Sequence, residues 1–110
     1  MRKKIPNSIK SILEEAKLRL KEFYGNRLKG IVLYGSYARG DATDGSDIDL
    51  IVLLEGMNDP VEEIYKCSNA FGDLELTYDT LISVLPLDVN EFRERRLPVI
   101  FNAKREGVAI

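Results

Sequence analysis

The sequence predicts a small α/β domain in which helices flank a mixed sheet of three or more strands. Its 110 residues suit one domain with a single modest core, so we treat residues 1–110 as one unit. Short runs of apolar and β-branched residues alternate with longer segments in which apolar residues recur at helical spacing. This alternation of strand and helix is typical of α/β proteins.

The first predicted element is a helix that begins near the candidate caps Asn7 and Ser8 and ends at Gly25 and Asn26. Its apolar residues recur every three or four positions and are Ile9, Ile12, Leu13, Ala16, Leu20 and Phe23. We therefore expect one face of this helix to pack on the core.

Two predicted strands follow this helix. The run GIVLY, residues 30–34, is short, apolar and bounded by glycine, which favours a buried strand. The run DIDLIVLLEG, residues 47–56, has apolar residues on both faces beyond Asp49. That pattern is typical of a central strand with both faces covered.

The second half of the chain predicts a further helix and a third strand. Helical spacing of apolar residues runs from Val61 to Leu74. The segment TYDTLISVL, residues 77–85, is β-branched and apolar enough for a strand, and Pro86 is expected to end it. The boundary between this helix and this strand is open by several residues.

The last part of the chain predicts mainly helix. Asp88 or Asn90 can cap a helix through EFRERR, residues 91–96, before Leu97 and Pro98 interrupt it. A last helical turn through residues 103–104 precedes the final VAI, for which we expect extended backbone.

Composition excludes several kinds of active site. The sequence has no histidine and one cysteine, Cys67, which excludes Ser-His-Asp and Cys-His catalysis as well as zinc sites built from histidine or several thiolates. An enzyme of this composition must use carboxylates, hydroxyls and basic side chains. A hard cation such as Mg²⁺ suits such oxygen ligands.

Charge and hydropathy limit the partners. Sixteen Lys and Arg against 18 Asp and Glu give a net charge of -2, so no general attraction to nucleic acid or anionic membrane is expected. No apolar stretch approaches the roughly 20 residues of a membrane span, and the start MRKKIPNS leads into an amphipathic pattern, so we expect a cytoplasmic protein. The basic cluster Arg93, Arg95 and Arg96 is most simply a solvated helix face, and a local RNA contact stays open.

The segment GSYARGDATDGSDIDL, residues 35–50, concentrates four aspartates between two apolar runs. Asp47 and Asp49 are two residues apart, so in a strand their side chains share a face, ~7 Å apart along the backbone. Two such carboxylates repel each other unless a cation lies between them. An acid inside a buried strand also costs several kcal/mol unless it is paired or metal-bound. Asp41 and Asp44 need no such explanation, because any solvated loop uses them.

The first half of this segment suits a phosphate. Gly35 lets backbone N–H groups approach a phosphate closely, the hydroxyl of Ser36 can donate to it, and Arg39 adds positive charge. A P-loop is excluded because Gly40 is followed by Asp41 rather than by lysine. An EF-hand and a Rossmann fingerprint are also excluded, because this sequence lacks the glycines that each motif requires.

These residues resemble the signature of the polymerase-beta-like nucleotidyltransferase superfamily, in which Gly-Ser is followed about ten residues later by Asp-x-Asp. The form with Ala-Arg-Gly and Ser-Asp-x-Asp-Leu is similar to the minimal nucleotidyltransferases, the antitoxin half of HEPN–MNT toxin–antitoxin pairs. The resemblance is strongest over residues 30–54. It implies the minimal nucleotidyltransferase fold, ATP as substrate and Mg²⁺ as cofactor.

The resemblance also implies a role for each matching residue. The implied nucleotide-binding residues are Gly35, Ser36, Arg39 and Ser46. Asp47 and Asp49 are implied as catalytic residues that ligate Mg²⁺, with a third carboxylate on a later strand. Asp79 is the first candidate for this third acid, because it lies within the apolar run TYDTLIS. Glu75 and Asp73 compete with it if the strand starts earlier.

The leading hypothesis is Mg²⁺-dependent transfer of a nucleotidyl group, AMP from ATP, onto a hydroxyl of a partner macromolecule. By resemblance this partner is a HEPN-family toxin. A chain of this length leaves no room for an acceptor domain, so a partner or a second copy of the chain is expected to complete the acceptor site. The alternative is a non-catalytic antitoxin that binds nucleotide or toxin, and a nucleotide-sugar transferase is disfavoured by length.

Overall fold

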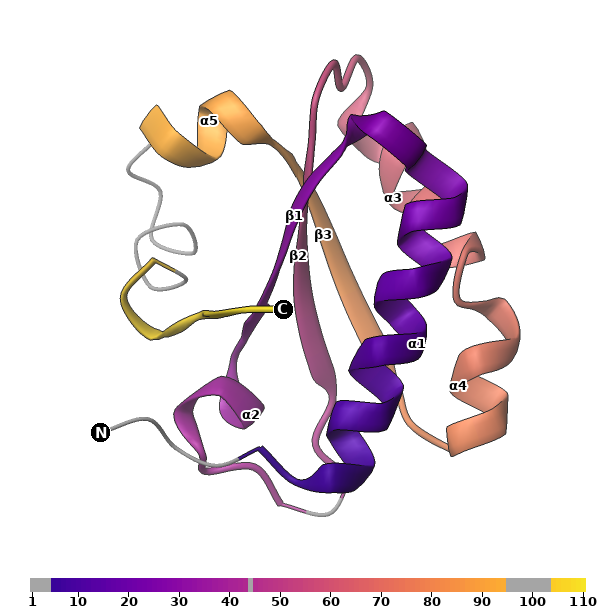
Figure 1. Ribbon diagram of the computed structural model, residues 1–110, viewed down its shortest axis with the longest axis vertical. Helices are drawn as coiled ribbons and strands as arrows, with labels where there is room; N and C mark the ends of the chain where they lie inside the picture. Colours follow the sequence, from indigo (N-terminus) through magenta and orange to yellow (C-terminus); the bar gives the residue numbers. More distant parts are fainter. Residues whose placement is uncertain (1–4, 44, 95–103) are drawn as a thin grey trace.

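The computed structural model describes residues 5–43, 45–94 and 104–110. The elements in chain order are α1 (Asn7–Tyr24), a 3₁₀ turn (Gly25–Arg27), β1 (Leu28–Tyr34), α2 (Ser36–Arg39), β2 (Ile48–Leu54), α3 (Pro60–Asn69), α4 (Gly72–Tyr78), β3 (Ile82–Asp88), α5 (Val89–Glu94) and β4 (Val108–Ala109). α1, α3 and α4 cover one face of the sheet, and α5 lies on the other side (Figure 1). The predicted α/β class is confirmed.

Within the described residues the sheet has four strands in the order β3-β2-β1-β4. β1 is antiparallel to β2 and to β4, whereas β2 and β3 are parallel. The sheet is therefore mixed, as predicted. β2 lies between two neighbours, and its residues 50–54 are all buried, which confirms that it is a central strand.

Alternate residues of β2 serve two separate hydrophobic clusters. Ile48, Leu50, Val52 and Leu54 belong to the cluster formed with α1, α3 and α4. Ile51 and Leu53 instead belong to the cluster that includes Val89 and Phe92 of α5. Because side chains alternate along a strand, Asp49 lies on the same face as Ile51 and Leu53.

The predicted helix over residues 61–74 and strand over residues 77–85 are both corrected by the structure. The helix is divided into α3 and α4, and α4 continues through Tyr78, so the strand begins only at Ile82. Leu74 is buried, whereas Leu76 is 85% exposed, as expected for one apolar side of a helix. Packing of Phe71 and Leu74 on the core outweighs the local β propensity of Thr77 and Tyr78.

Pro86 does not end the third strand but lies inside it. Within the described residues β3 is an edge strand, and its residue Ile82 donates its N–H away from β2, to Oε2 of Glu75 at 3.1 Å. Pro86 follows Ile82 by four residues, so the N–H that proline lacks would also point away from the sheet. Proline and the Glu75 contact together leave fewer free backbone donors on this edge.

The end of the described chain agrees with the predicted cap and extended segment. Asp88 accepts hydrogen bonds from the N–H groups of Asn90 and Glu91, at 2.9 and 3.4 Å, at the start of α5. The final extended segment forms β4. The remainder of the predicted helix, with Arg95 and Arg96, and residues 97–103 lie outside the described residues. No described helix is long and apolar enough to cross a membrane.

A buried hydrogen-bonded group joins α1, the 3₁₀ turn and α3. Glu63 is 5% exposed and accepts from the Tyr24 hydroxyl and from Arg27 Nη2, both at 2.9 Å. Burial by itself would raise the pKa of Glu63, but the hydrogen bonds from Arg27 and Tyr24 outweigh it and lower the pKa. The charged carboxylate is thus a stabilising part of the fold.

We expect Glu63→Ala to lower the free energy of unfolding in urea by about 2 kcal/mol, because the Tyr24 hydroxyl loses its partner. Glu62→Ala, which removes an exposed ion pair with Lys66, should cost below about 0.5 kcal/mol. The pKa of Glu63 is lowered by folding, so its contribution is present above the ordinary value of 4.5 and is lost as the pH falls further. Equal effects of the two substitutions would contradict this assignment.

Candidate active site

The centre of the site is a contact between the end of β1 and the start of β2. Gly35 has φ 75° and ψ -155°, a conformation that is open almost only to glycine. A Cβ at Gly35 would collide with Oδ2 of Asp49 and would lie 3.2 Å from its Cγ. Asp49 therefore occupies the space that the missing side chain leaves.

The charges of Asp47 and Asp49 interact at the start of β2. Asp47 is exposed and precedes β2 directly, whereas Asp49 is half-buried within it. Burial, and then the negative charge of Asp47, raise the pKa of Asp49, while Arg39 lowers it. The strand spacing thus brings two like charges together in a partly desolvated place.

Arg39 lies on α2, the short helical turn after Gly35. The carbonyl of Gly35 accepts from the N–H of Arg39 at 3.0 Å, which folds the turn back toward the strand end. Arg39 Nε donates to Asp41 at 3.2 Å, and its Nη1 lies 3.8 Å from Oε2 of Glu106. The guanidinium is therefore near three carboxylates, those of Asp41, Glu106 and Asp49.

Glu106 is a residue of this neighbourhood that sequence reasoning missed. It precedes β4 and reaches Arg39 because β4 pairs with β1. The sequence separation of 67 residues between Arg39 and Glu106 gives no local signal. In the sequence it is marked only as an acid two residues before the final extended segment.

The other predicted phosphate-binding residues lie in the same loop. Ser36 is half-buried and begins α2. Ser46 is engaged within the loop, since its hydroxyl accepts from the N–H of Thr43 at 2.9 Å. Its hydroxyl therefore holds the loop closed ahead of Asp47.

The structure does not bring the predicted third acids to this pair. Asp79 is exposed and caps the C-terminal end of α4 with φ 50°, so its expected place inside a strand is wrong. Glu75 binds the N–H of Ile82, and Asp73 forms an ion pair with Arg19. Among the described residues, no group of three or more histidines, cysteines or acids is placed to hold a metal ion.

The two carboxylates nevertheless fit a divalent cation. Mg²⁺ is commonly held by one or two carboxylates together with substrate phosphates. Asp47 is exposed, and the charge repulsion with Asp49 is what a cation would relieve.

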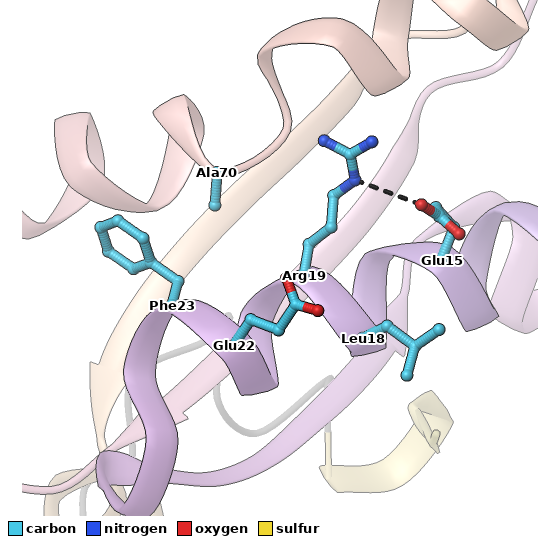
Figure 2. Close-up of a pocket in the computed structure, with 6 residues that line it drawn as sticks. All are labelled: Glu15, Leu18, Arg19, Glu22, Phe23 and Ala70. Carbon is cyan, nitrogen blue, oxygen red and sulfur yellow. Dashed lines mark hydrogen bonds and ion pairs between the residues drawn. The ribbon is translucent and has the colours of Figure 1, made fainter.

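A groove on the opposite, helical side of the sheet is a separate feature (Figure 2). It encloses about 480 Å³ between α1 and the turn that joins α3 to α4. Figure 2 shows the Arg19 side chain extending across it, paired with Glu15 on the same helix. Its lining contains none of the residues 35–49, so we place the active site at the carboxylate pair instead.

Comparison with known proteins defines the family. The nucleotidyltransferase domain family matches residues 13–109, so this chain belongs to that family. A Methanocaldococcus jannaschii protein assigned as a protein adenylyltransferase is 35% identical over 72 residues, which are 66% of this chain and 72% of that protein. Another from that organism with the same assignment is 46% identical over 54 residues, covering 49% of this chain but only 52% of its own length.

Solved structures share the fold. A Sulfolobus solfataricus nucleotidyltransferase has a TM-score of 0.60 at 22% identity, covering 96% of this chain and 87% of its own. A minimal nucleotidyltransferase has a TM-score of 0.61 at 18% identity, with 93% and 95% covered. The complex of the Shewanella oneidensis tri-AMPylated HEPN toxin with its MNT antitoxin gives 0.60 at 18% identity, with 91% and 69% covered. The chain thus has the minimal nucleotidyltransferase fold.

The contact between Gly35 and Asp49 predicts that alanine at position 35 weakens ligand binding, whereas alanine at position 25 does not. Gly35→Ala should displace the Asp49 carboxylate and weaken binding of Mn²⁺ with ATP by about tenfold or more, in addition to backbone strain of about 1–3 kcal/mol. Gly25→Ala is the matched control, because Gly25 also has positive φ but a Cβ there meets nothing within 4 Å. It should show the loss of stability alone, by calorimetry and urea unfolding. Equal nucleotide binding by both variants would contradict the contact.

Proposed function

We propose that this chain transfers AMP from ATP to a hydroxyl group of a partner protein in the cytoplasm. The observation that carries the proposal is the Asp49 carboxylate held against Gly35 with the charge of Asp47 beside it, where β1 ends and β2 begins. The family and the names of the relatives support nucleotidyl transfer and a protein acceptor. This fold is shared with a chain of the solved complex between an AMPylated HEPN toxin and an MNT antitoxin, which favours a toxin of that kind as the partner.

In this proposal the chain's residues bind and orient the nucleotide. Gly35 and Ser36 approach the triphosphate with backbone N–H groups and a hydroxyl, and Arg39 contributes positive charge from α2. Ser46 keeps the loop closed beside the phosphates. Asp47 and Asp49 would hold Mg²⁺, which when bound neutralises charge on the phosphate oxygens.

The reaction itself is a displacement at phosphorus. The acceptor oxygen attacks the α-phosphorus, the bond from this phosphorus to the oxygen that bridges to the β-phosphate breaks, and pyrophosphate leaves. The proton of the acceptor hydroxyl passes to solvent or to a group that the partner supplies. Asp79 is not assigned a part in this chemistry, because it is exposed at the end of α4.

The test uses ATP labelled at either the α- or the γ-phosphate, incubated with Mg²⁺ and a lysate that contains the partner. Label should reach protein only from the α-position. In the double variant Asp47→Asn, Asp49→Asn the rate of this transfer should fall at least about 100-fold, because the cation is no longer held. Transfer from the γ-position would contradict nucleotidyl transfer, and a double variant as active as the wild type would contradict the site.

The non-catalytic antitoxin gives a different result in the same experiment. The wild type would then bind ATP or the partner without transferring label. Neutralisation of the toxin would also survive the double substitution, whereas the proposed function requires it to be lost.

A further inference from the structure

Ser83 of β3 lies next to Asp49 in the sheet. β2 and β3 are parallel, and their register pairs Asp49 with Ser83. Leu85 and Leu87 of β3 join the hydrophobic cluster on the α5 side, so Ser83, in phase with them, also lies on the face of Asp49. Ser83 is half-buried, so a side chain at this position borders both Asp49 and the solvent.

Both neighbours of Asp49 in the sheet are uncharged. Tyr34 of β1 pairs with it on one side, and Ser83 of β3 on the other. Neighbouring strands lie ~4.8 Å apart, so an acid at position 83 would reach a cation held by Asp49. This chain has a hydroxyl there instead.

No other described acid takes that place. Glu75 is bound to the backbone N–H of Ile82, and Glu106 contacts Arg39. Asp79 is exposed at the end of α4. Outside the described residues, the sequence contains one acid, Asp44.

We propose that the site is a two-carboxylate site that binds its divalent cation only together with the nucleotide, because Ser83 occupies the position of a third carboxylate. This inference rests on the proposed function. Two carboxylates supply only part of the six oxygen ligands of Mg²⁺, and the phosphates of the nucleotide supply more of them along with negative charge. Cation and nucleotide therefore bind as a pair.

The inference predicts that Ser83→Asp creates a site that binds the cation by itself. We would titrate Mn²⁺ into the full chain by calorimetry, with and without α,β-methylene ATP, which cannot release pyrophosphate. The wild type should bind Mn²⁺ at least about tenfold more tightly with the nucleotide than without it. Ser83→Asp should bind Mn²⁺ without nucleotide at least about tenfold more tightly than the wild type.

Three further variants isolate the cause. Ser83→Ala should bind Mn²⁺ as the wild type does, since the hydroxyl is not a required ligand. Ser68→Asp adds the same charge at an exposed position of α3 and should give no gain. Adding Asp49→Asn to Ser83→Asp should remove the gain, and circular dichroism checks that each variant is folded.

The outcomes separate this inference from the proposed function. Wild-type protein that binds Mn²⁺ equally well without nucleotide would overturn the inference. A folded Ser83→Asp variant without gain would also overturn it, while α-label transfer by the wild type would leave the proposed function intact. A wild type that does not bind Mn²⁺ with nucleotide and does not transfer label would contradict the proposed function itself.

Discussion

The close approach of Gly35 to the carboxylate of Asp49 is the contact on which the rest of the site depends. It exists because β1 and β2 are antiparallel neighbours, so the end of one strand meets the start of the other. The loop that joins β1 to β2 therefore begins and ends at the same end of the sheet. This brings Arg39 and Asp47 close to Asp49. A single side-chain carbon at position 35 would disturb this whole arrangement.

The two faces of the sheet have different roles. One face packs the larger core, and the other carries Asp49 of the candidate site. Ile48, Leu50 and their partners on α1, α3 and α4 form the larger core, which is closed by the buried Glu63 group. The opposite face has the smaller cluster under α5 and continues to Asp49. Because the apolar side chains of β2 pack into both clusters, the core fixes the position of Asp49.

The two neighbouring carboxylates of Asp47 and Asp49 make the site favourable for a positive charge. Asp49 faces Asp47 while its strand neighbours Tyr34 and Ser83 are neutral. Arg39 is shared with Asp41 and Glu106, so its charge is already partly balanced. In the proposed two-carboxylate site, a cation that binds together with the nucleotide supplies this positive charge without a third acid.

The sequence by itself determined the α/β class, the central strand and the proximity of Asp47 to Asp49, because these follow from side-chain periodicity within one segment. It also placed Gly35 and Ser36 directly after the first strand, because the apolar run that precedes them ends there. The tertiary structure alone decided where β3 begins, that Asp79 is outside the strand, and that Ser83 lies beside Asp49. These depend on how Phe71 and Leu74 pack and on the register between strands, and neither is expressed in local sequence patterns.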